Sequence, residues 1–148
     1  MKIKFAAIIF MSAVNYPEKW CRKVGKILVV DNQFGVRRLL LEIFNEDHEV
    51  KMAANGEAAL KLLIAFEPDL ILLDIKMPVM NGLEALEKIR SSGCQADVIM
   101  MTDYGDIQNM EQAKDLGILY YINKPFDVFE LRKRVNKILS SSWVITKG

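Results

Sequence analysis

The sequence predicts a doubly wound α/β fold, in which helices cover both faces of a five-stranded parallel sheet. The first observation is a pair of short apolar runs, residues 26–31 and 69–74, which lack helical spacing and are typical of buried parallel strands. The second observation is the order of the segments. Strand-like and helix-like segments alternate five times along the chain, and such alternation builds a parallel sheet through crossover connections.

The first half of the chain supplies three strands and two helices. Residues 26–31 form the first strand, and a helix follows over residues 34–45 because apolar residues recur there at helical spacing: Val36, Leu39, Leu40, Ile43 and Phe44. A short second strand covers residues 49–53. The Asn55-Gly56 turn opens a helix over residues 57–66, and Pro68 ends it before the third strand at residues 69–74.

The second half continues the alternation. A short helix over residues 83–90 follows the Asn81-Gly82 turn, and the fourth strand covers residues 97–102. The next helix, residues 107–116, is stopped by Gly117 and leads into the fifth strand at residues 118–123. Asp127 caps the last helix, which we expect to end near residue 139.

The chain has 148 residues, enough for one domain with a good core. We assign this domain to residues 26–140, with an N-terminal extension at residues 1–25 and a short tail at residues 141–148. In the extension, two lysines precede an apolar run at residues 5–14, which is too short to span a bilayer and lacks a clear cleavage site. We expect this run to pack on its own domain or on a second copy, and we favour the homodimer.

Charge and cysteine content exclude several classes of function. The net charge is +1, so no global field favours nucleic acid or a stable membrane association. Cys21 and Cys94 belong to no CxxC motif or Cys/His cluster, and we interpret them as reduced thiols of a cytoplasmic protein. No glycine-rich phosphate loop follows the first strand, which argues against a small-molecule enzyme of the flavodoxin type.

Polar side chains stand at the carboxyl ends of four predicted strands. Asp31 and Asn32 follow the first strand, and Asp74 ends the third. Thr102 ends the fourth strand, and Lys124 follows the fifth. Each residue alone has an ordinary explanation, such as a helix cap, a strand residue or a solvated side chain. Because open α/β sheets build their sites at this edge, we expect all five residues to form one site.

The motifs around these residues resemble the receiver domains of two-component response regulators, the CheY-like family. The resemblance covers residues 26 to about 139 and, within the family, is closest to the stand-alone sporulation phosphorelay receiver of Bacillus-type bacteria. It implies a flavodoxin-like receiver fold with strand order 2-1-3-4-5. The motifs that carry it, in order, are Val29-Val30-Asp31-Asn32, Leu72-Leu73-Asp74-Ile75-Lys76-Met77-Pro78, Met101-Thr102 and Asn123-Lys124-Pro125-Phe126.

The resemblance implies that Asp74 accepts a phosphoryl group from a sensor histidine kinase and that the chain relays it to a histidine phosphotransferase, as in a sporulation-type phosphorelay. Such a receiver assists its own phosphorylation and is not an enzyme in the usual sense. A divalent cation, Mg²⁺ or Mn²⁺, would be held by hard oxygen ligands. The implied ligands are Asp31, Asn32, Asp74 and the backbone carbonyl of Lys76.

The remaining roles implied by the resemblance concern the phosphoryl group and the partner. Thr102 would hydrogen-bond the phosphoryl group and Lys124 would pair with it, which suits a reaction that needs mainly positioning and charge neutralisation. Tyr121 stands where the family has an aromatic switch residue, and it is equally consistent with a core or rim tyrosine. The donor protein would cover the start of the first helix, at Gln33, Phe34, Val36 and Leu39, although Phe34 and Val36 are equally consistent with core positions.

Two residues depart from the family pattern. Asn32 replaces a second acid, so it offers an oxygen without a charge and puts the metal affinity in question. Asp103 stands where a small residue is usual and adds an acid beside the site. These departures leave an alternative open, in which the chain is a degenerate receiver that binds proteins without being phosphorylated. The intact Asp74, Thr102 and Lys124 argue against it.

Overall fold

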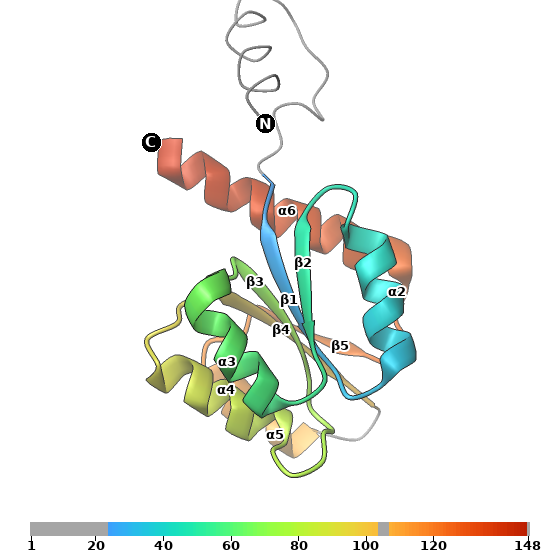
Figure 1. Ribbon diagram of the computed structural model, residues 1–148, viewed down its shortest axis with the longest axis vertical. Helices are drawn as coiled ribbons and strands as arrows, with labels where there is room; N and C mark the ends of the chain where they lie inside the picture. The colour runs from blue at the N-terminus through green and yellow to red at the C-terminus, as the bar shows by residue number, and fades with distance from the viewer. Residues whose placement is uncertain (1–23, 104–106, 148) are drawn as a thin grey trace, which may run out of the picture.

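The computed structural model describes residues 24–103 and 107–147, and it contains the predicted parallel sheet (Figure 1). The order β2-β1-β3-β4-β5 confirms the expected 2-1-3-4-5 topology, and all neighbouring strands run parallel. The strands are β1 (Lys26–Val30), β2 (Glu49–Ala53), β3 (Leu70–Asp74), β4 (Asp97–Thr102) and β5 (Tyr120–Asn123).

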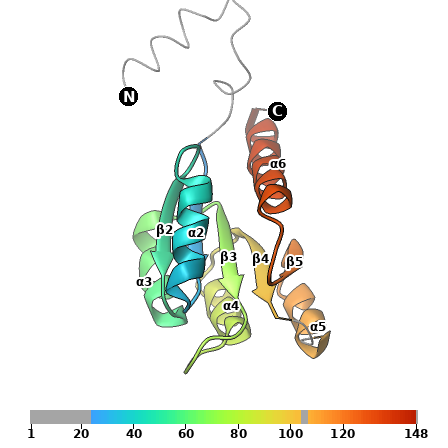
Figure 2. The same ribbon diagram turned by 90° about the vertical axis from the view of Figure 1, so that its right-hand side faces the viewer.

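Helices cover both faces of the sheet, as the alternation predicts. On one face lie α3 (Gly56–Phe66), α4 (Gly82–Ser91) and α5 (Ile107–Asp115), and on the other lie α2 (Phe34–Phe44) and α6 (Val128–Lys147) (Figures 1 and 2). The expected turn residues start two of these helices. The side-chain oxygen of Asn55 accepts from the Ala58 N–H at 2.8 Å, and that of Asn81 accepts from the Glu84 N–H at 3.0 Å.

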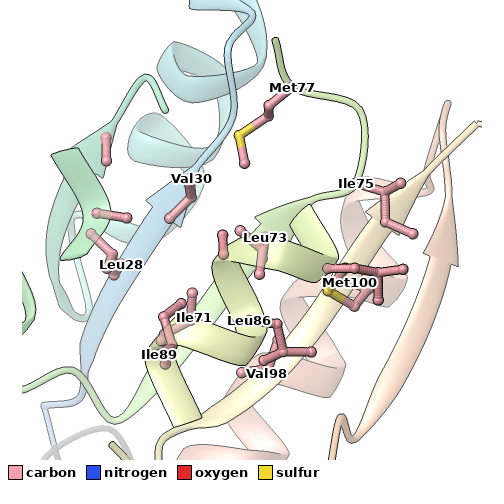
Figure 3. Close-up of a cluster of buried hydrophobic side chains, with 14 of the residues drawn as sticks. Leu28, Val30, Ile71, Leu73, Ile75, Met77, Leu86, Ile89, Val98 and Met100 are labelled. Atoms are coloured by element: carbon pink, nitrogen blue, oxygen red, sulfur yellow. The ribbon is translucent and has the colours of Figure 1, made fainter. Parts of the chain in front are cut away.

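Strand β3 lies at the centre of the sheet, and all five of its residues are buried. Because successive side chains of a strand point to opposite faces, this strand contributes to both layers of the core. Ile71 and Leu73 enter the cluster beneath α3, α4 and α5 (Figure 3), whereas Leu70 and Leu72 enter the cluster beneath α2 and α6. Burial of such a side chain stabilises the fold by about 1.5–3 kcal/mol. Asp74 is therefore held at the end of the most firmly packed strand.

The single histidine of the chain ties α6 to the opposite, amino-terminal edge of the sheet. His48 is buried, and its Nδ1 accepts from the Gly25 N–H at 3.1 Å. Its Nε2 lies 3.0 Å from the side-chain oxygen of Asn136 in α6. A ring that accepts at Nδ1 and donates at Nε2 is the neutral Nε2–H tautomer, so this histidine joins the start of β1 to the last helix without carrying a charge.

Two predicted boundaries were wrong. Strand β5 begins at Tyr120 rather than at residue 118, because the Ile118 N–H closes α5 by donating to the Ala113 carbonyl at 3.4 Å. Helix α6 continues to Lys147 rather than ending near residue 139, so most of the expected tail is helical. The Ser140 hydroxyl donates to the Asn136 carbonyl, four residues back in the same helix, at 2.7 Å, so its hydrogen-bonding potential is used within the helix.

The predicted apolar run at residues 5–14 and the homodimer expected from it lie outside the described residues, as does Cys21. Cys94 carries a free thiol. Within residues 24–103 and 107–147, no helix is both long and apolar enough to cross a bilayer.

Arg90, near the end of α4, holds several chain segments together. Its Nη1 donates to the carbonyls of Cys94 at 3.1 Å and Ala96 at 2.7 Å. Its Nε and Nη2 donate to the carbonyls of Leu116 at 2.9 Å and Gly117 at 3.3 Å. The guanidinium thus connects the end of α4, the approach to β4 and the turn after α5.

We expect Arg90→Lys to lower the free energy of unfolding by about 1–2 kcal/mol, because one ammonium cannot reproduce a planar fork that serves four carbonyls. Urea denaturation measures the change. Arg38→Lys is the matched control, since Arg38 forms an exposed i,i+4 pair with Glu42 and such pairs contribute little. Equal losses in the two variants would contradict a special role for Arg90.

Candidate phosphoacceptor site

Four polar side chains meet at the carboxyl edge of the sheet. Asp31 follows β1 and is fully buried, while Asp74 at the end of β3 and Thr102 at the end of β4 are 3% and 1% exposed. Lys124 follows β5, and its Nζ lies 2.6 Å from Asp31 Oδ2 and 3.3 Å from Asp74 Oδ1. The ammonium therefore joins two buried carboxylates. The sequence placed Lys124 at the same edge as both carboxylates, but it did not predict that the shorter contact would be with Asp31.

The turn after β1 orients Asp31. The Gln33 N–H donates to Asp31 Oδ1 at 2.8 Å, which leaves Oδ2 to Lys124. Arg37, one turn into α2, donates through Nη1 to the Asp31 carbonyl at 2.7 Å. This role of Arg37 was not predicted from the sequence, because no motif distinguishes an arginine that binds a backbone carbonyl from a solvated one.

The loop after β3 returns closely to Asp74. The Gly82 N–H donates to the Ile75 carbonyl at 2.8 Å, and a Cβ at Gly82 would collide with the backbone of Asp74 and Ile75. Only glycine leaves room for this approach. The Lys76 N–H lies 3.4 Å from Asp74 Oδ1. On the far side of the site, the Lys124 N–H donates to the Thr102 carbonyl at 2.6 Å, which aligns the lysine with the end of β4.

The charges of the site do not balance. Burial, reinforced by the negative charge of Asp31, raises the pKa of Asp74 from 3.8 to about 6, although the Lys124 ammonium acts in the opposite direction. Two carboxylates share one ammonium, so the ionised site carries an excess negative charge. That excess, together with hard oxygen donors, is what a divalent cation such as Mg²⁺ requires.

The residues that could bind a Mg²⁺ ion differ in charge and in burial. Asp31 and Asp74 offer buried carboxylates, whereas Asn32 and Lys76 are exposed and could contribute only an amide and a backbone oxygen. Asn32 is neutral, and the described residues contain no cluster of three or more acids, histidines or cysteines suited to a metal ion. An open hollow of about 520 Å³ lies beside these oxygens, and its lining includes Asn32, Lys76 and Pro78. The residues present therefore fit a Mg²⁺ ion, with one charge fewer than a pair of acids would give.

Comparison with known proteins identifies the family. The model of the response regulator receiver domain matches residues 27–136. The chain belongs to this family. It is a receiver domain of the two-component response regulator type, as the motifs predicted.

Relatives of this receiver domain include a phosphotransferase and a chemotaxis protein. Sporulation initiation phosphotransferase F of Bacillus subtilis is 44% identical over 115 residues, which cover 77% of this chain and 93% of that protein. Chemotaxis protein CheY of Halobacterium salinarum is 33% identical over 78% of this chain and 98% of its own length. Among solved structures, the CheY-like receiver domain protein of Methanospirillum hungatei matches with a TM-score of 0.77 at 28% identity, covering 84% of this chain and all of that one.

The remaining residues predicted from the sequence, Tyr121 and the expected partner surface, differ in how deeply they are buried. Tyr121 is partly buried against the cluster beneath α3, α4 and α5, and it pairs with Met100 in β4. Of the expected partner surface, Gln33 is exposed, and Phe34 and Leu39 are 71% and 42% exposed. Val36 is partly buried against the other cluster. Phe34 and Leu39 are thus accessible to a partner, whereas Val36 belongs in part to the core.

Asp103 faces the rim of the site. Its carboxylate lies 3.8 Å from Lys76 Nζ, and both side chains are 57% exposed. This contact neutralises a lysine that would otherwise repel a cation near Asp74. We therefore expect Asp103 to support Mg²⁺ binding through the local field without ligating the ion.

Asp103→Ala should weaken Mg²⁺ binding about two- to threefold, as expected for an exposed charge worth roughly 0.5 kcal/mol. The loss should be smaller in an Asn32→Asp background, where a second acid is present. Isothermal titration calorimetry of the four proteins in this double-mutant cycle measures the coupling. Additive effects, or tighter binding without Asp103, would show that the two positions act independently.

Proposed function

We propose that this receiver accepts a phosphoryl group on Asp74 from the phosphohistidine of a sensor histidine kinase and relays it to a histidine phosphotransferase. The observation that carries this proposal is the arrangement of the three largely buried groups: Lys124 Nζ lies 2.6 Å from Asp31 Oδ2 and 3.3 Å from Asp74 Oδ1. A structural ion pair would need one carboxylate. The second carboxylate beside the same ammonium, that of Asp74, is explained if it is the group that accepts the phosphoryl group.

The proposed reaction is an in-line displacement at phosphorus. A carboxylate oxygen of Asp74 forms the new O–P bond while the P–N bond of the phosphohistidine breaks, and the imidazole nitrogen keeps that electron pair and takes up a proton. The pKa of Asp74, raised to about 6, leaves the carboxyl mostly ionised and nucleophilic at neutral pH. Lys124 then pairs with the transferred phosphoryl group, and the Thr102 hydroxyl hydrogen-bonds it.

A Mg²⁺ ion, or Mn²⁺ in its place, would be held by Asp31 and Asp74 with the oxygens of Asn32 and Lys76. When bound, it supplies positive charge that neutralises the phosphoryl oxygens. The chain's own residues position the two carboxylates. The Gln33 N–H fixes the orientation of Asp31, and the close approach of Gly82 fixes the backbone of Asp74.

The place in a sporulation-type phosphorelay rests on similarity. The relative from Bacillus subtilis is named a sporulation initiation phosphotransferase, and the match covers 93% of its length. A receiver that shares nearly the whole length of such a protein is a candidate for the same kind of relay. The cytoplasm, where kinase phosphoryl donors act, is the compartment we propose for it.

Phosphotransfer assays test the proposal in two steps. First, phosphoramidate with Mg²⁺ should add one phosphoryl group to the wild-type chain and none to Asp74→Ala, as read by intact mass. Second, autophosphorylated histidine kinases from the same genome should label the wild type, which should pass the label to a histidine phosphotransferase. A wild-type chain that no donor labels, yet binds a kinase, would instead favour the phosphorylation-independent binding module.

A further inference from the structure

Val79 has an unusual backbone conformation. Its φ is 68°, and among the described residues only Glu67 and Val79 have positive φ without being glycine. Glu67 has an ordinary reason, because it terminates α3 in the left-handed conformation that is common at helix ends. Val79 lies in the loop between β3 and α4, where the Met80 N–H donates to the Pro78 carbonyl at 2.8 Å. A three-residue turn of this kind, centred on a residue with positive φ, is rare and strained.

A valine is poorly suited to this position. Its branched Cβ makes positive φ a genuine outlier, whereas glycine or asparagine adopts it more easily. The side chain is 106% exposed, so no packing within the described chain offsets the strain. Backbone strain that no contact within the fold offsets is a reason to look for a function of the residue in binding another molecule.

The loop holds this side chain at a fixed place beside the site. Its far end is tied by Gly82, whose N–H donates to the Ile75 carbonyl, and by Asn81, whose side chain caps α4. Pro78, the neighbour of Val79, lines the same hollow as Asn32 and Lys76. The turn therefore presents an apolar side chain to solvent at the rim around Asp74.

We propose that Val79 is a specificity-determining residue whose side chain packs on an apolar patch of the protein that carries the phosphohistidine. The inference rests on the proposed function and names the partner chemistry at the same site. Donor and acceptor atoms must come within about 3–3.5 Å for in-line transfer, so the protein surface around the histidine must cover the rim. Phe34, 71% exposed, begins the helix that follows β1, the strand beside β3, and so offers a second apolar contact at the same edge of the sheet. A small phosphodonor has no such surface and does not need Val79.

The experiment compares two donors. The autophosphorylated histidine kinase that labels the wild-type chain fastest carries a protein surface, and phosphoramidate carries the same P–N bond without one. With Val79→Asn, we expect kcat/KM for transfer from the kinase to fall about tenfold, which corresponds to about 1.4 kcal/mol. Labelling by phosphoramidate should stay at the wild-type rate. The Tm should rise by about 2–4 °C, because asparagine relieves the strain.

Two further variants make the test specific. Val79→Ile keeps an apolar branched side chain and should retain kinase transfer within about twofold, which corresponds to roughly 0.4 kcal/mol. Ile64→Ser is the matched control, because Ile64 is an apolar residue on α3 that is 85% exposed, and it should change neither reaction.

Wild-type kinase transfer in Val79→Asn would overturn the inference, and so would an equal loss with phosphoramidate, because the defect would then lie in the site itself. A loss of transfer in Ile64→Ser equal to that in Val79→Asn would also overturn it. Failure of phosphoramidate to label the wild-type chain would reject the proposed function, and the role of Val79 with it.

Discussion

Asp74→Asn should abolish labelling by phosphoramidate and, at the same time, stabilise the metal-free protein at neutral pH. The loss of labelling follows because an amide oxygen is not a useful nucleophile toward phosphorus. The gain in stability follows because the wild-type site holds two buried carboxylates against one ammonium. With asparagine at this position, the pair of Asp31 and Lys124 is balanced.

The raised pKa of Asp74 fixes the sign and the pH window of this effect. The folded state binds the proton more tightly than the unfolded chain between pH 3.8 and about 6, so wild-type stability falls as pH rises through that window. A shift of this size corresponds to at most about 3 kcal/mol, and we expect roughly 1–2 kcal/mol after relaxation of the site. The advantage of Asp74→Asn should thus be full at pH 7 and disappear near pH 4.

Urea denaturation in EDTA across pH 4–8 measures this difference. Addition of Mg²⁺ should narrow the gap at pH 7, because a bound cation supplies the charge that the wild-type site lacks. Asp69→Asn is the matched control, since Asp69 accepts a structural bond from the Lys26 N–H at 2.8 Å and, among the residues that the structure describes, shares no ammonium with a second acid. An Asp74→Asn protein that is less stable than wild type at pH 7 would show that the site is electrostatically balanced without a metal.

The second large effect is expected for Lys124→Met. This change removes the cation between Asp31 and Asp74 and leaves two buried carboxylates without a partner. We expect the free energy of unfolding at pH 7 to fall by about 3–5 kcal/mol, as for other buried pairs that lose one member. Loss of the ammonium also removes the influence that lowers the pKa of Asp74, so the deficit should shrink as the pH is lowered and that carboxyl is protonated.

Lys76→Met provides the control for Lys124→Met. Lys76 forms a 3.8 Å pair with Asp103 that is 57% exposed on both sides, so its removal should cost little. The double variant Lys124→Met/Asp74→Asn should recover part of the lost stability, because only one unpaired carboxylate remains. Thermal and urea unfolding at pH 5 and pH 7 provide these values. A Lys124→Met protein as stable as wild type at both pH values would contradict a structural role for the ammonium.

The parts of this fold that a sequence can predict are those set by local pattern. The run that ends at Asp74 is apolar on both faces, so its burial, its central place and its terminal carboxylate follow directly from the residues. The caps at Asn55 and Asn81 follow in the same way from their side-chain chemistry. The parallel order of the strands places the polar residues at the carboxyl ends of β1, β3, β4 and β5 at one edge.

The features that the sequence did not predict depend on distant contacts. Arg90 and Arg37 bind backbone carbonyls that have no sequence signature, and the short contact of Lys124 with Asp31 depends on how two loops pack. The extension of α6 past residue 139 was missed because serines usually weaken a helix, and here Ser140 bonds within it. The positive φ of Val79 contradicts the backbone preference of valine, so it could not be predicted from residue propensities.

The hydrogen bonds of His48 make its ring a spectroscopic probe of the edge of the sheet away from Asp74. Because the sequence contains a single histidine, every imidazole signal in an NMR spectrum of this chain comes from one buried ring. That ring touches the start of β1 and the side chain of Asn136 at the edge of the sheet away from Asp74. Without any label added to the protein, the chemical shifts of this ring therefore report whether phosphorylation at the Asp74 edge of the sheet changes the contact with the last helix at the opposite edge.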